Sequence, residues 1–136
     1  MGRIIKITNR LEEVPLMMAS IEDICAEEGI DEMTILGINL ALEEAVVNVV
    51  NYAYPEGTVG DIEMEVNADA KAITFILRDH GKPFDPTAAK EVDITLSAEE
   101  RQIGGLGIHL IRNYMDEVKY DYCDGQNVLT LVKNIE

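Results

Sequence analysis

The chain has 136 residues, 26 of them Asp or Glu and 11 Lys or Arg, so its formal net charge is −15. Apolar residues make up 47% of it, enough for a buried core, and it has no run of about 18 apolar residues that would indicate a membrane span. The acidic balance argues against direct binding of nucleic acid or of an anionic membrane, since both need a basic patch. Two isolated cysteines and no apolar leader favour a cytoplasmic protein with reduced thiols.

The first third of the chain is predicted to form a strand and two helices. Residues 4–8 have the pattern of a short strand, and Asn9 is a candidate N-cap for a helix over residues 11–28. Asp31 is the expected N-cap of a second helix, which continues to about Tyr54 before Pro and Gly stop it.

The remainder is predicted to hold four strands, one helix and a long irregular segment. The strands span residues 61–66, 72–77, 118–122 and 128–132, the helix 106–115, and the irregular segment 83–104. That segment is too long for a plain connector, so we interpret it as a functional lid. The element order predicts a single α+β domain over residues 1–136, a two-layer α/β sandwich with helices on one face of a mostly antiparallel sheet.

Three polar residues interrupt the apolar second helix. Glu44, Asn48 and Asn51 fall within about 60° of one another on one helical face. The stripe is either a solvent-facing edge or the floor of a cavity. In a cavity, the Asn oxygen would suit Mg²⁺ and the Glu would orient or deprotonate a hydroxyl.

Two glycine-containing segments offer further candidate sites. Asp79 follows an apolar strand, where its carboxylate can accept a hydrogen bond from an exocyclic amine, and Gly81 lets the backbone approach a flat ligand. An ordinary turn has the same pattern. The run from Gly104 to Gly107 opens the third helix, where free backbone N–H groups bind anions or simply form a turn.

The order of these segments resembles the GHKL ATPase superfamily, whose nucleotide-binding fold is the Bergerat or histidine-kinase-like ATPase fold. Residues 42–54 resemble its N box, residues 79–81 its first glycine box and residues 104–107 its second. The compact size and the G-L-G-I-H-L-I helix resemble the branch of anti-sigma-factor serine/threonine kinases. Tyr52 stands where that family often has His.

The resemblance implies roles for the phosphate end of a bound nucleotide. Glu44 would be the general base or would orient a hydroxyl, and Asn48 would hold Mg²⁺. Asn51 is a further candidate contact, and Arg101 is a candidate for the γ-phosphate or a solvated surface charge. The second glycine box would supply backbone amides, from Gly104, Gly105, Leu106 and Gly107.

At the base end, the resemblance implies that Asp79 reads the adenine amine with Gly81 beside it. Phe84 would bracket the base or pack under the lid, and Thr130 would form a hydrogen bond near the adenine.

The activity implied is transfer of phosphate from ATP, with Mg²⁺, to a Ser or Thr of an anti-anti-sigma protein of the STAS type. A sigma factor is a possible second partner, and a homodimer is expected. The alternative is a nucleotide-gated binding switch without turnover. A detached histidine-kinase catalytic domain is a further interpretation, ranked lower because no helical hairpin with a phospho-accepting His precedes the N box.

Overall fold

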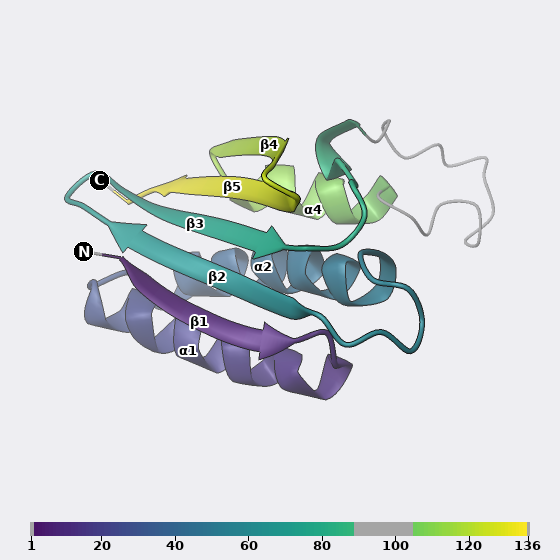
Figure 1. Cartoon of the computed structure of the whole chain (residues 1–136). Coiled ribbons are helices and arrows are strands. Elements are labelled where there is room, and N and C mark those ends of the chain that lie inside the picture. The colour runs from purple at the N-terminus through teal and green to yellow at the C-terminus, as the bar shows by residue number, and fades with distance from the viewer. Residues whose placement is uncertain (1, 89–104, 136) are drawn as a thin grey trace.

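The sheet has five strands in the order β1-β2-β3-β5-β4, and every neighbouring pair is antiparallel (Figure 1). The computed structural model describes residues 2–88 and 105–135, and statements about structure refer to these residues. All five predicted strands are confirmed, each slightly longer than expected. The strands are β1 (Arg3–Thr8), β2 (Asp61–Ala68), β3 (Ala72–Asp79), β4 (Glu117–Cys123) and β5 (Gln126–Asn134).

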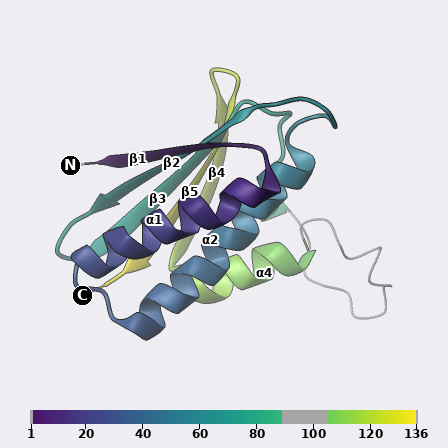
Figure 2. The same ribbon diagram turned by 90° about the horizontal axis from the view of Figure 1, so that it is seen from below.

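All the α-helices of the described residues cover the same face of this sheet (Figure 2). They are α1 (Val14–Glu27), α2 (Glu32–Tyr52) and α4 (Gly105–Tyr114). The predicted α+β sandwich is therefore confirmed. Helix α2 is long and apolar enough to cross a membrane by length and composition alone. Its position between α1 and α4, with one side buried under the sheet, accounts for that composition.

The start of α1 corrects one prediction. Asn9 does not cap it: its side chain donates to the Thr58 carbonyl at 2.8 Å and accepts from the Gly60 amide at 3.0 Å. A 3-10 turn (Leu11–Glu13) comes first, so the predicted helix is divided there. At α2 the prediction is confirmed, since the Asp31 side chain accepts from the Thr34 amide at 3.0 Å.

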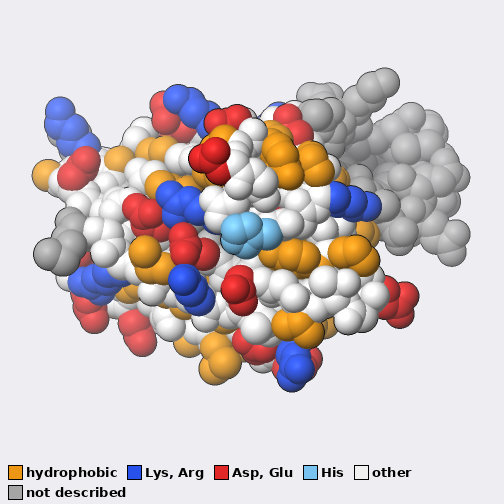
Figure 3. Space-filling view, viewed as in Figure 1, with side chains coloured by type: hydrophobic (Ala, Val, Ile, Leu, Met, Phe, Trp, Pro, Cys, Tyr) orange, Lys and Arg blue, Asp and Glu red, His pale blue; other side chains and the backbone are white. Residues whose placement is uncertain are grey.

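The face of the sheet opposite the helices is solvated, and Figure 3 shows acidic, basic and hydrophobic side chains intermixed across it. Arg78 on β3 lies between two carboxylates of β2, 3.0 Å from Glu63 and 2.9 Å from Glu65. Such a solvated face is usual in antiparallel sheets that pack on one side only. The buried polar side chains of the described residues, Asn48, Asp79 and Asn127, lie instead between the sheet and the helices.

Candidate nucleotide-binding site

Two buried polar side chains meet at one end of the sheet, on its helical side. Side chains alternate between the two faces along a strand, and Asp79 ends β3 in the same inward phase as Phe75 and Leu77. Asn127 lies directly opposite on β5. The two residues are 3% and 5% exposed, and the Asn127 Nδ2 donates to Asp79 Oδ1 at 2.9 Å.

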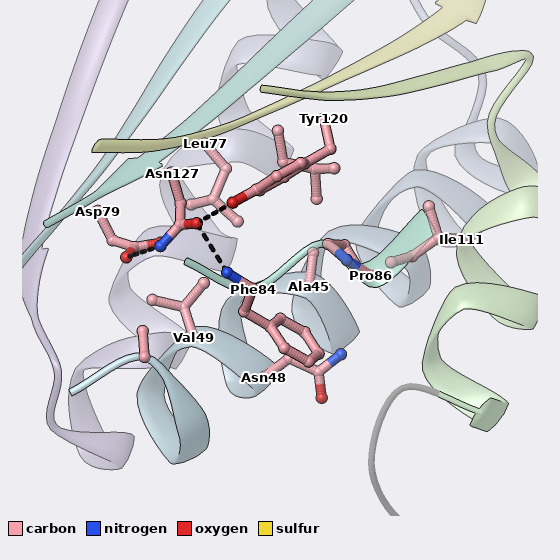
Figure 4. A pocket seen from close by; sticks show the side chains of 12 residues that line it. Ala45, Asn48, Val49, Leu77, Asp79, Phe84, Pro86, Ile111, Tyr120 and Asn127 are labelled. Atoms are coloured by element: carbon pink, nitrogen blue, oxygen red, sulfur yellow. Dashed lines mark hydrogen bonds between the residues drawn. The ribbon is translucent and has the colours of Figure 1, made fainter. Parts of the chain in front are cut away.

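The Asn127 carboxamide joins three segments of the chain (Figure 4). Besides Asp79, its Nδ2 donates to the Lys82 carbonyl at 2.8 Å. Its Oδ1 accepts from the Phe84 amide at 3.0 Å and from the Tyr120 hydroxyl. These partners fix the orientation of the amide, because a flipped group would set its oxygen against two acceptors and its NH₂ against the Phe84 N–H.

The Asp79 carboxylate is satisfied on one oxygen only. Its Oδ1 accepts from both the Gly81 amide, at 2.8 Å, and Asn127. No described residue donates to Oδ2. Burial raises the pKa of Asp79, and the hydrogen bonds from Asn127 and Gly81 oppose that rise. A ligand N–H that reaches Oδ2 would therefore add a hydrogen bond that no described residue provides.

Asp79 and Asn127 form the polar end of a hollow with mostly apolar walls (Figure 4). Such a hollow with a few placed polar groups is typical of a small-molecule site. Four elements contribute walls: α2, β3, α4 and the β4–β5 hairpin. The lining residues are Ala45, Asn48, Val49, Ala53, Leu77, Asp79, Phe84, Pro86, Ile111, Tyr120, Asn127 and Leu129.

Of the three polar residues predicted to share a face of α2, only Asn48 lines the hollow. Glu44 lies one turn earlier and is half-buried. Asn51 is exposed and lines a separate groove beside Tyr54 and Thr58. Three residues along a helix rotate a side chain about 60° short of a full turn, and here that rotation takes Asn51 out of the hollow. Asn51 therefore does not line the hollow, and its contact with the phosphate end of a nucleotide stays a prediction.

Gly81 is required for space rather than for contact with the hollow. A Cβ on Gly81 would lie 2.3 Å from the Ala53 carbonyl oxygen. That same oxygen accepts from the Lys82 amide at 2.9 Å. The segment after Asp79 is thus held against the C-terminal end of α2 by a backbone contact that any side chain at Gly81 would prevent.

Tyr54 holds the same segment from the other side. Its hydroxyl donates to the Asp61 carbonyl at 2.7 Å and accepts from the His80 amide at 2.8 Å. The ring lies so close to Gly60 that a Cβ there would be 2.2 Å from it. Ala53 and Tyr54, which end the resembled N box, therefore position the loop that carries the first glycine box.

Phe84 lines the hollow, and whether it brackets the base stays a prediction. Its ring centroid lies 6.5 Å from that of Tyr52, with a tilt of 36° between the planes. This is an ordinary distance for an aromatic pair. Tyr52, at the position where the family often has His, therefore packs toward the segment that leads into the predicted lid.

The second glycine box lies at the edge of the described structure. Gly105, Leu106 and Gly107 form the first turn of α4, whose Ile111 lines the hollow. First-turn N–H groups of a helix have no intrahelical partners and suit an anion. Arg101 and Gly104, with the predicted lid from residue 89 to 104, lie outside the described residues.

The position of Thr130 differs from the prediction that it forms a hydrogen bond near the adenine. Thr130 pairs with Ile76 on the face of the sheet opposite the helices, so it does not line the hollow. The run Val128–Val132 is apolar or β-branched at every position, which hides the inward phase. Asn127, which sequence reasoning missed, shares the inward phase of Leu129 and Leu131. Extending the alternation of Leu131 and Leu129 two residues back along β5 would have identified Asn127 as an inward-facing residue.

Asn48 fits a role in holding Mg²⁺ at the phosphates. It is 8% exposed, and its buried Nδ2 has no hydrogen-bond partner among the described residues. Nδ2 is a donor and suits a phosphate or water oxygen, so the metal would be held by Oδ1. The same residues contain no group of three His, Cys, Asp or Glu that could hold a metal alone. Mg²⁺ commonly keeps waters and binds through one or two protein oxygens plus substrate phosphates. A single Asn oxygen beside a nucleotide is consistent with that pattern.

We expect Asp79→Asn to raise thermal stability at pH 7. The pKa of Asp79 is raised by burial, so its stabilising contribution is full at acid pH and is lost as pH rises through the folded-state pKa. Asn keeps the acceptor for Gly81 and Asn127 without a buried charge. The gain in Tm over wild type, measured by thermal unfolding, should shrink toward about pH 4. Asp23→Asn, an exposed carboxylate on α1, serves as the control, and lower stability of Asp79→Asn at pH 7 would contradict the expectation.

The chain is similar to known proteins over most of its length. The sequence model of the histidine kinase-like ATPase domain matches residues 7–133. The serine/threonine-protein kinase BtrW of Bordetella bronchiseptica is 30% identical over 97 residues, which cover 71% of this chain and 68% of BtrW. The serine-protein kinase RsbW of Listeria monocytogenes is 32% identical over 132 residues, which cover 91% of this chain and 84% of RsbW.

Two solved structures share the fold. The RsbU and RsbW domains of Rv1364c from Mycobacterium tuberculosis match with a TM-score of 0.70 and 17% identity, over 98% of this chain and 32% of that chain. This chain thus spans about a third of the Rv1364c chain. The SiaB-SiaC complex from Pseudomonas aeruginosa matches with a TM-score of 0.53 and 15% identity, over 98% and 91%. At these identities the likeness concerns the fold alone.

Proposed function

The chain belongs to the histidine kinase-like ATPase family, in its GHKL branch of anti-sigma-factor serine kinases, and on that premise we propose that it transfers phosphate from ATP to a protein. The acceptor is a Ser or Thr of a STAS-type anti-anti-sigma partner, and a sigma factor is a second partner of the same proposal. The proposal places the protein in the cytoplasm, as a homodimer with one nucleotide-binding domain per chain.

The observation that carries the proposal is the half-satisfied carboxylate of Asp79 in an apolar hollow. Its free Oδ2 is an acceptor for an exocyclic amine, while the apolar walls suit a flat base. Asn48 lines the same hollow from α2. Base recognition and a metal-holding amide thus converge from two elements on one cavity, as binding of a nucleotide requires.

In this proposal each site residue has a chemical role. Asp79 binds the base amine, and Asn48 would hold Mg²⁺, which supplies charge neutralisation at the transferring phosphate when bound. The first-turn amides of α4 bind phosphate oxygens. Glu44, one turn before Asn48 on α2, accepts the proton of the attacking hydroxyl. The phosphate site thus needs few Lys or Arg side chains, which is compatible with a net charge of −15.

The test is a transfer assay. The protein is incubated with Mg-ATP and the STAS-domain protein of the same organism, and the acceptor is examined by mass spectrometry for one added phosphate. Transfer supports the kinase. Binding of Mg-ATP and partner without transfer would support the nucleotide-gated switch instead, and failure to bind Mg-ATP would overturn both.

We expect Asn48→Ala to weaken ATP binding chiefly when Mg²⁺ is present. Loss of the metal contact should raise the Kd for Mg-ATP about tenfold or more, because hydrogen bonds and ligands to charged groups contribute about 1.5–3 kcal/mol. In EDTA the two proteins should bind ATP alike. Isothermal titration calorimetry in both conditions measures this, with Asn113→Ala, an exposed amide near the end of α4, as the control. An equal loss in EDTA would contradict the metal role.

A further inference from the structure

The Asn127 carboxamide has no hydrogen-bonding capacity left for a ligand. Its two N–H groups are used by Asp79 and Lys82, and its oxygen accepts from Phe84 and Tyr120. An amide offers two donors and two acceptor sites, so all four are occupied within the protein. Any effect of Asn127 on the hydrogen bonds of a bound nucleotide therefore acts through the groups that it holds.

We propose that Asn127 is a positioning residue that sets base specificity: by occupying one oxygen of Asp79 it leaves the other as the only acceptor offered to the base. This deepens the proposed function and rests on it. The site would thereby favour a purine with a 6-amino group over one with a 6-oxo group, since a carboxylate oxygen repels a carbonyl oxygen.

The reason lies in what Asp79 would do without this donor. Its Oδ1 would keep only the Gly81 amide, at 2.8 Å. A buried carboxylate with fewer donors turns or takes up a proton, and a protonated carboxyl can donate to a 6-oxo group as readily as a carboxylate accepts from a 6-amino group. Discrimination between the two bases would be lost, although the hollow would keep its shape.

The other two hydrogen bonds of Asn127 extend this effect to the start of the predicted lid. They fix the carbonyl of Lys82 and the amide of Phe84 against β5. The residue that orients the base acceptor is thus the one that anchors Phe84, whose ring forms a wall of the hollow. The residues that contact the base are therefore held in place by hydrogen bonds to β5.

The test compares ATP with ITP, which carries an oxygen in place of the 6-amino group. Asn127→Asp keeps the acceptor for Phe84 and Tyr120 and removes both N–H donors, the one to Asp79 and the one to the Lys82 carbonyl. We expect the ratio of the Kd for ITP to the Kd for ATP, from calorimetry, to fall at least tenfold in this variant. Tyr120→Phe removes a bond on the other side of the amide and should change both Kd values together, leaving the ratio as in wild type.

Thr130→Val is the matched control, since it lies on the same strand but faces away from the hollow. Circular dichroism checks folding, and Asn127→Leu provides the same comparison should Asn127→Asp not fold. An unchanged ratio in a folded Asn127 variant, an equal fall in Tyr120→Phe, or equal affinities for ATP and ITP in wild type would each overturn the inference. Lack of ATP binding in wild type would overturn the proposed function itself.

Discussion

Glu44→Gln is expected to lower the rate of phosphate transfer about 10²–10⁴-fold, the range that a positioned general base contributes. Gln keeps the length and shape of the side chain but cannot accept the proton of the attacking hydroxyl. Because Glu44 does not line the hollow that holds Asp79 and Asn48, the Kd for Mg-ATP should stay within about twofold of wild type. Single-turnover transfer to the STAS-domain acceptor and calorimetry with Mg-ATP measure the two quantities.

The neighbouring acid provides a matched control. Glu43 is exposed and lines a groove against α1 with Pro15 and Met18, on another side of the same helix. Glu43→Gln makes the same chemical change and should transfer phosphate at the wild-type rate. If both variants lost activity equally, the effect would be one of charge on α2 rather than of a base. If Glu44→Gln kept its rate, the base would have to be another group.

The polar stripe of α2 shows how far the sequence predicts the site. Helical periodicity places Glu44, Asn48 and Asn51 on one side of the helix. In the structure Asn48 is the one of the three that is buried. Which of them lines the hollow depends on the rotation of α2 about its own axis relative to β3 and α4. That angle is set by packing, such as the contact of Gly37 with the ring of Tyr114, which no local pattern reveals.

Asn127 was missed for a different physical reason. Strand β5 carries apolar or β-branched residues on both faces from Val128 to Val132, so alternation cannot tell inside from outside. The pairing of Asp79 with Asn127 resolves the phase, but it depends on a register between strands about 48 residues apart in sequence. The sequence therefore predicts the fold and singles out Asp79, whereas Asn127, which binds the Asp79 carboxylate, can be identified only once the strand pairing is known.

Gly81→Ala is expected to destabilise the fold and to abolish ATP binding together. The new Cβ would lie 2.3 Å from the Ala53 carbonyl oxygen, a backbone atom that cannot turn aside as a side chain would. The loop must move away from α2, which breaks the 2.9 Å hydrogen bond from Lys82 to Ala53. Overpacking of this kind costs about 1–3 kcal/mol, measurable as a lower midpoint in urea unfolding.

Loss of binding follows from the same movement. Gly81 donates one of the two hydrogen bonds that fix Asp79 Oδ1, so a displaced loop releases the carboxylate that reads the base. Calorimetry with Mg-ATP should then show no binding at concentrations that saturate wild type. His80→Ala is the control, because it alters the exposed neighbour whose backbone amide alone contacts Tyr54. Full stability and full binding in Gly81→Ala would mean that the loop approaches α2 less closely than the structure shows.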